Sequence, residues 1–126
     1  MKTLSTLLAS GLVLALSGCT TVNLDSSGDT AAVYQLNEFR MVLNTTAPVA
    51  FKATQKALRD LDLFETKSNL QTYEGELYAR SRQDDKVYVS IAEMNSRQTM
   101  LKIRWGTTGD RKNSTLLYKA IESHLH

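Results

Sequence analysis

Cys19 is the only cysteine of the 126-residue chain, and its thiol is the one soft nucleophile in the sequence. Two small residues, Ser17 and Gly18, precede it, and before them lies an apolar stretch from Leu4 to Leu16. Small side chains let an extended segment enter a peptidase site, and a thiol can accept a diacylglyceryl group. The pattern therefore predicts cleavage between Gly18 and Cys19 and acylation of Cys19.

Residues 1–18 have the layout of a signal peptide, with a positive start at Lys2 followed by the apolar stretch. That stretch has 13 residues and contains several polar ones, whereas a helix that crosses a bilayer needs about 20 apolar residues. Leu16-Ser17-Gly18-Cys19 resembles the bacterial lipobox, which implies several acyl chains on the cysteine. Two or more chains anchor a protein stably, so we expect lipid, and no spanning helix, to hold the chain at a membrane.

The residue after Cys19 bears on which membrane that is. In enteric lipoproteins an aspartate at this position retains the protein at the inner membrane, and this chain has Thr20. The resemblance implies the cell envelope, and in a Gram-negative cell the outer membrane facing the periplasm. Residues 19–32 show no sustained hydrophobic period and predict an acylated N-terminus with a short tether. The folded domain is expected at residues 33–126.

Composition narrows the class of protein. With 42% hydrophobic residues and 22% charged residues, the chain has the makeup of one globular domain. Beyond residue 18 there are 14 basic and 13 acidic residues, a net charge of +1. The basic residues come in short groups next to acidic ones, whereas nucleic-acid binders concentrate them in a stripe. We therefore expect no nucleic-acid partner.

Hydrophobic periodicity predicts the elements of the domain. Spacing of two indicates a strand at 34–43 and four more at 64–70, 76–82, 87–92 and 99–105. Spacing of three and four indicates a helix at about 49–62, with Thr45, Thr46 and Pro48 as its start. A second helix follows Gly109, capped by either Asp110 or Ser114. The expected fold is α+β, an antiparallel sheet of four to five strands with two helices on one face, in the order β-α-β-β-β-β-α.

The ending Ile103-Arg104-Trp105-Gly106-Thr107-Thr108-Gly109-Asp110, with Ser114 and an apolar helix after it, resembles a known family. Together with the lipobox and the alanine-rich helix at 49–61, it is similar to the small bacterial lipoproteins of domain-of-unknown-function family 3568. Trp105 stands where that family tends to have valine, and Arg111 where an acidic residue is common. The resemblance implies a fold and a location, and it supplies no catalytic residue.

Three groups of residues can be interpreted either as chemical sites or as structural features. Gly106 and Gly109 before Asp110-Arg111-Lys112 suit an anion site at a helix start, but a phosphate loop needs Gly-Lys-Ser/Thr there, so a turn with a helix cap is favoured. His124 and His126 stand at the chain end without acidic or thiol ligands in register, which favours terminal residues over a metal site. Adjacent Asp84 and Asp85 point apart and favour a polar turn over a catalytic pair.

The aromatic residues give the remaining candidate site. Tyr78 and Tyr88 lie on predicted strands and form a possible interaction surface, although a sheet prefers aromatic residues in any case. Tyr73 and Trp105 are further members of this set, and an error of one residue in register would exchange the two faces.

The expected function is a non-catalytic binding or interaction module of the envelope, with an envelope protein or peptidoglycan as partner and no cofactor or metal. The alternative is a small-ligand carrier or a hydrolase that uses a groove between helices and sheet. No serine can be combined with a histidine and an acid in a triad on any geometric ground, so the binding module is favoured.

Overall fold

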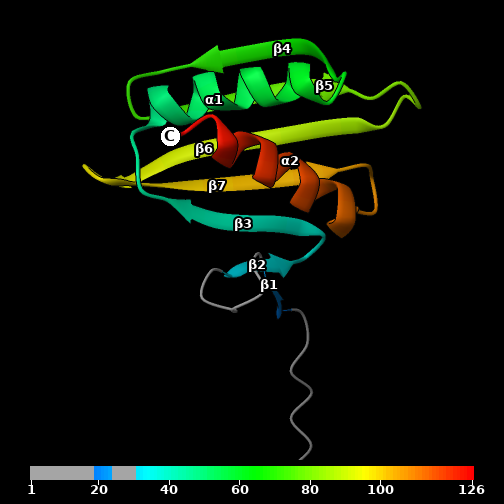
Figure 1. Ribbon diagram of the computed structural model, residues 1–126, viewed down its shortest axis with the longest axis horizontal. Coiled ribbons are helices and arrows are strands. Elements are labelled where there is room, and N and C mark those ends of the chain that lie inside the picture. The colour runs from blue at the N-terminus through cyan, green and yellow to red at the C-terminus, as the bar shows by residue number, and fades with distance from the viewer. Residues whose placement is uncertain (1–18, 24–30) are drawn as a thin grey trace, which may run out of the picture.

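The computed structural model describes residues 19–23 and 31–126. The predicted signal peptide at 1–18 and part of the predicted tether lie outside the described residues. The described chain forms one seven-stranded sheet in the order β1-β2-β3-β7-β6-β5-β4, in which every neighbouring pair is antiparallel. Two helices lie on one face of this sheet (Figure 1). The predicted α+β class with two helices on one face of an antiparallel sheet is confirmed.

The strand bounds are β1 Cys19–Asn23, β2 Ala31–Gln35, β3 Glu38–Leu43, β4 Phe64–Leu70, β5 Glu74–Arg80, β6 Lys86–Asn95 and β7 Gln98–Trp105. The helices are α1 Ala47–Asp60 and α2 Arg111–Ser123.

The N-terminal part of the sheet differs from the prediction. The single strand expected at 34–43 is two strands, β2 and β3, because the chain reverses at Leu36 and Asn37, whose φ angles are 55° and 64°. Two successive residues with positive φ make the tight hairpin turn that matches the twist of a sheet. Residues 19–23, expected within the tether, form β1 and pair with β2. The sheet therefore has seven strands, where four to five were predicted.

Helix α1 begins at the predicted place but is capped differently. Thr46 is its N-cap and Pro48 lies in its first turn, yet the Thr46 side chain makes no capping hydrogen bond. Instead, the backbone N–H of Ala47 donates to Oε1 of Glu93 on β6, at 2.8 Å. A carboxylate suits this position because the free N–H groups at a helix start carry partial positive charge. The cap ties α1 to the sheet.

The core lies between the helices and the sheet. Alternate residues of β5, β6 and β7 face the helices and are almost fully buried, as the spacing of two predicted. On α1 the alanines at 47, 50, 53 and 57 are at most 2% exposed, and these small side chains let the helix approach the sheet closely. Helix α2 contributes Leu117, Tyr118 and Ile121, each at most 2% exposed. None of the helices in the described ranges is long and apolar enough to cross a membrane.

Tyr118 is a buried residue of the core whose hydroxyl can titrate at alkaline pH. Its ring packs against Phe39 with 5.4 Å between centroids, and its hydroxyl donates to Glu122 Oε2 at 3.3 Å. Burial, and then the Glu122 charge, raise the pKa of Tyr118 from its usual value of 10.0 to about 12. The folded state thus holds this proton more tightly than the unfolded chain, so the stability linked to it is complete below pH 10 and is lost as the pH rises to 12.

We therefore expect the free energy of unfolding to fall by roughly 2 kcal/mol more in the unsubstituted protein than in Tyr118→Phe over that range. Urea unfolding followed by circular dichroism at several alkaline pH values measures this difference. Parallel curves for the two proteins would show that Tyr118 does not titrate with folding.

Candidate binding surface on the open sheet face

The sheet face opposite the helices is uncovered in the described structure, and two tyrosines lie on it toward the β4 edge of the sheet. Tyr78 on β5 is directly opposite Tyr88 on β6, and Tyr88 is directly opposite Arg104 on β7. The two rings are 4.9 Å apart between centroids and tilted by 45°, a geometry in which aromatic rings attract each other. Both side chains are half-buried, so each presents part of its ring to solvent.

Charged groups flank the tyrosine pair on both sides. The Lys67 ammonium on β4 lies 5.6 Å from the Tyr78 ring centroid, within the range of a cation–π contact. The Tyr88 hydroxyl donates to Glu76 Oε1 at 3.2 Å. Burial, and then the Glu76 charge, raise the pKa of Tyr88 above its usual range. The pair is therefore held in place by contacts to its neighbours.

A row of polar residues runs across the sheet beside the tyrosines. Arg40, Lys102, Ser90 and Glu76 are consecutive cross-strand partners on β3, β7, β6 and β5. Arg40 also pairs with Glu38 at 3.1 Å. The open face thus offers aromatic rings next to donors and acceptors of both charges, a combination that suits recognition of a polar partner.

Both tyrosines of the predicted interaction surface lie on the same outward face. The sequence alone had not decided which face of the sheet each tyrosine occupies. The hairpin register places residue 78 opposite residue 88, so the two side chains must share a face. Of the other aromatic candidates, Tyr73 lies in the β4–β5 turn at 67% exposure, and Trp105 is buried on the helix side at 7%. Sequence reasoning missed Lys67 and Arg104, because only the strand order brings them to the pair. It also missed Glu76, although the spacing of two from Tyr78 along β5 places that side chain on the same face.

The turn before α2 has the structural role that was favoured over an anion site. Gly106 and Gly109 have φ angles of 76° and 80°, which glycine adopts without strain. Asp110 is the N-cap: its Oδ1 accepts from the Asn113 backbone N–H at 2.9 Å, and its Oδ2 from Asn113 Nδ2 at 2.8 Å. This settles the choice between Asp110 and Ser114. A negative group of the chain itself already occupies the helix start.

The two histidines lie apart from the tyrosine pair. His124 ends α2, and its Nε2 lies 2.6 Å from Asp60 Oδ2 at the end of α1. This contact is a link between the two helices that the prediction of terminal residues missed, since Asp60 is distant in sequence. His126 is exposed. Among the described residues no group of three or more histidine, cysteine or acidic side chains is arranged to hold a metal ion.

The two adjacent aspartates point to different partners, as predicted. Asp84 pairs with Arg80, and Asp85 accepts from the Trp105 indole N–H at 3.4 Å. Asp84 has a φ of 68° in the turn between β5 and β6.

A hollow of about 500 Å³ lies beside these aspartates at one end of the helix layer, with Leu61 and Leu116 in its lining. The alternative function, a small-ligand carrier or hydrolase, would have room for its ligand in this hollow.

Comparison with known proteins gives a family and no function. No curated protein matches the chain. The family model described as "Protein of unknown function (DUF3568)" matches residues 2–124, which is nearly the whole sequence. The chain therefore belongs to the DUF3568 family of proteins of unknown function, as its lipobox, alanine-rich helix and Gly-Asp ending had suggested.

Proposed function

We propose that this protein is a lipid-anchored, non-catalytic binding module of the bacterial cell envelope, attached through Cys19 and binding its partner on the open sheet face. The observation that carries the proposal is the Tyr78–Tyr88 pair, which lies half-buried on β5 and β6 of that uncovered face. Exposed aromatic residues held by neighbouring contacts are frequent centres of binding surfaces. The expected partner is an envelope protein or peptidoglycan.

Two features support anchoring at Cys19. The lipobox Leu16-Ser17-Gly18-Cys19 predicts acylation of this residue, and the family match begins at residue 2, so it includes the lipobox segment. The strand β1 begins at Cys19 itself, so an acylated Cys19 would join the sheet to the lipid with no spacer. In a Gram-negative cell Thr20 favours the outer membrane, facing the periplasm.

A role in binding fits the contacts of the candidate reactive groups better than catalysis does. The Asp84 and Asp85 carboxylates have different partners, and Asp110 is engaged as a helix cap. By contrast, the tyrosine pair has ring surface left for a partner. Such rings can stack on a sugar or on an apolar side chain, while Lys67 and Glu76 offer a charge of each sign beside them.

Alanine in place of Tyr78 or Tyr88 is expected to weaken partner capture by about tenfold or more, since truncating a central aromatic residue of an interface commonly costs over 1 kcal/mol. The measurement is co-sedimentation of the purified protein with peptidoglycan sacculi, in parallel with pull-down from envelope extract. Tyr73→Ala is the matched control, because Tyr73 is exposed in a turn and does not belong to the pair.

Site-specific photo-cross-linking gives the second readout. A photoreactive phenylalanine analogue at position 78 or 88 should cross-link to one defined partner in cells, and the same analogue at position 73 should not. Equal cross-linking from all three positions would contradict a binding site at the tyrosine pair. Turnover of an envelope substrate by the purified domain would overturn the non-catalytic assignment.

A further inference from the structure

The excess positive charge of the described chain is concentrated on the helix layer. Helices α1 and α2 together contain two acidic residues, Asp60 and Glu122, and six basic ones, which gives a net charge of +4. The remaining described residues comprise eight basic and nine acidic ones, a net charge of −1. The basic residues of the helix layer are Lys52, Lys56, Arg59, Arg111, Lys112 and Lys119.

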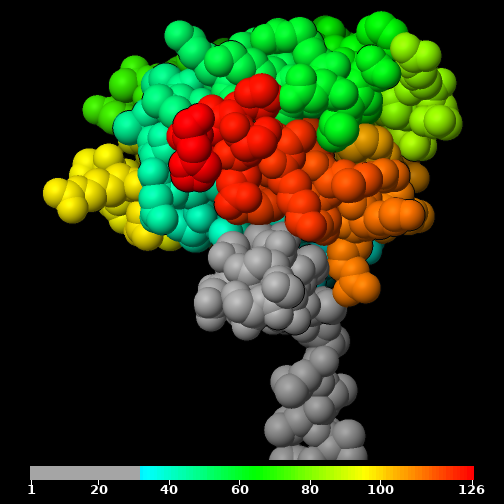
Figure 2. All heavy atoms as spheres, viewed as in Figure 1, coloured from blue at the N-terminus to red at the C-terminus, as the bar shows by residue number. Residues whose placement is uncertain are grey.

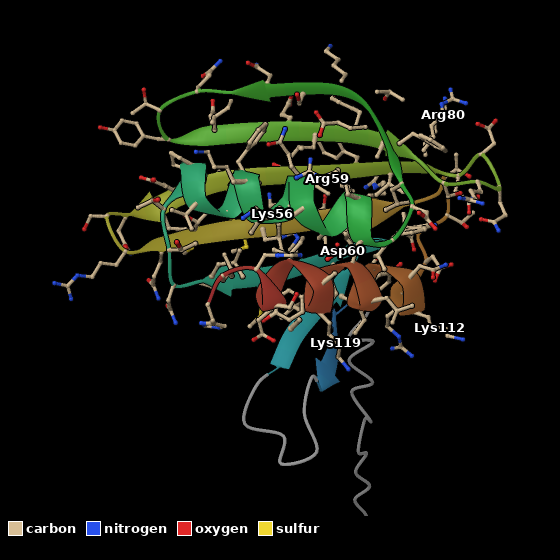
Figure 3. The ribbon with its side chains drawn as sticks, turned by 45° about the horizontal axis from the view of Figure 1, so that its top comes forward. Lys56, Arg59, Asp60, Arg80, Lys112 and Lys119 are labelled. Carbon is tan, nitrogen blue, oxygen red and sulfur yellow. The ribbon has the colours of Figure 1, made fainter. Side chains whose placement is uncertain are left out.

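These cations line the solvent side of both helices. On α1, Lys52, Lys56 and Arg59 are spaced by four and three residues, which places them on one side of the helix, away from the buried alanines. On α2, Lys112 and Lys119 are two helical turns apart and therefore also lie on one side of the helix. Figure 3 shows Lys56 and Arg59 on α1 and Lys112 and Lys119 on α2, and Figure 2 shows the two helices side by side in one broad surface.

The solvent side of each helix also carries one exposed aliphatic side chain among its cations. Val49 lies three residues before Lys52 and is 47% exposed, and Leu116 lies between Lys112 and Lys119 and is 48% exposed. The apolar faces of both helices are buried against the sheet, so these two side chains are the aliphatic residues that the helices expose beside their cations. The helix layer thus combines charge with a small apolar contact.

None of the six helix cations makes a close ion pair with a neighbour within the described ranges. The ion pairs found there involve Arg40, Arg80, Arg82 and His124, and none of the six helix cations. Both acids of the layer have partners of their own: Asp60 contacts His124, and Glu122 accepts from the Tyr118 hydroxyl. An anionic surface would therefore meet a field that is positive overall.

We infer that the helix layer docks on the anionic phospholipid headgroups of the membrane that holds the acylated Cys19. The inference rests on the proposed anchoring. Because β1 begins at Cys19, the lipid would hold the folded body against the headgroups, where unscreened attraction acts over about 8–10 Å. The open sheet face, on the opposite side from the helices, then points away from the bilayer. Docking thereby leaves the tyrosine pair accessible to its partner.

A vesicle experiment without the lipid anchor isolates the helix layer. The protein used is the chain from residue 19 with Cys19→Ser, which retains every described helix and strand and the whole buried core. It should sediment with vesicles of phosphatidylcholine and phosphatidylglycerol, and not with phosphatidylcholine alone. Added salt should release it, because screening weakens the attraction.

Charge variants identify the surface. Combining Lys56→Gln, Arg59→Gln and Lys119→Gln is expected to lower the partition coefficient by about tenfold or more, since each basic residue near an anionic surface contributes severalfold.

The matched control is Arg80→Gln, Lys86→Gln and Arg97→Gln, which removes the same charge from the strand ends and turns and should leave binding nearly unchanged. Circular dichroism and thermal unfolding confirm the fold of each variant.

Equal losses in the two triple variants would overturn the inference, because net charge alone would then explain binding. Absence of binding to the anionic vesicles, or binding that salt does not weaken, would overturn it as well. The proposed anchoring is judged separately by fatty-acid labelling of the native protein. Helix-dependent vesicle binding in a protein that takes up no fatty acid would support the docking surface and contradict only the anchor.

Discussion

Replacing Cys19 by serine is expected to abolish fatty-acid incorporation and to release the protein from the membrane fraction. The reason is chemical: the serine hydroxyl is a much poorer nucleophile than the thiol, and no other cysteine exists in the chain to replace it. Each buried methylene of an acyl chain contributes about 0.8 kcal/mol to membrane binding, so the loss of several chains removes most of the attachment. Labelling of cells with a radioactive fatty acid, followed by fractionation, measures both effects.

Thr20→Asp is the matched control for this experiment. The substitution lies next to Cys19 but leaves the thiol intact, so labelling should persist. By the enteric sorting rule, the aspartate should also move the protein to the inner membrane, which density-gradient separation of the two membranes detects. Fatty acid that still enters the Cys19→Ser protein would contradict acylation at this residue.

Gly109→Ala is expected to lower the free energy of unfolding by about 3 kcal/mol. A methyl group at this position would meet the Tyr34 hydroxyl and would lie 2.7 Å from the Asn37 carbonyl oxygen, which is backbone and cannot turn aside. The φ of 80° adds strain, since an L side chain in this conformation costs roughly 1–2 kcal/mol. Overpacking a filled site costs typically about 1–3 kcal/mol more. Chemical unfolding followed by circular dichroism measures the loss.

Gly106→Ala separates the two causes. Gly106 has a similar φ of 76°, but an added methyl group meets nothing within 4 Å. We therefore expect a loss of only about 1–2 kcal/mol, from the backbone conformation alone. If the two variants lost the same stability, the contact of Gly109 with the β2–β3 turn would not be important for the fold.

Much of the fold is local enough to be predicted from the sequence. Strand β4 has the predicted bounds, although it is exposed along its whole length. Strands β5 to β7 lie within a few residues of their predicted bounds, because alternating burial requires alternating hydrophobic residues. The helix α1 follows from its alanine and leucine spacing. The turn at Leu36 and Asn37 was missed because the Asn-Gly or Asp-Gly pair that usually marks a two-residue hairpin is absent there.

The candidate binding surface was predicted in part. The two tyrosines were identified from their residue type, and the hairpin made their pairing possible. Their common outward face, and the presence of Lys67 and Arg104 around them, depend on which strands lie side by side. No local pattern encodes that order.

From the sequence alone came the lipobox pattern, the fold class, the two helices and two candidate capping residues for α2, of which the local contact between Asp110 and Asn113 selects Asp110. The tertiary structure was needed to find that Glu93 on β6 caps α1. It was also needed to find that the two helices, whose basic residues outnumber their acidic ones, lie next to each other on one face of the sheet. Periodicity reports the burial of each residue within its own segment, whereas a cap from a distant strand and a shared charged surface require segments far apart in sequence to lie together.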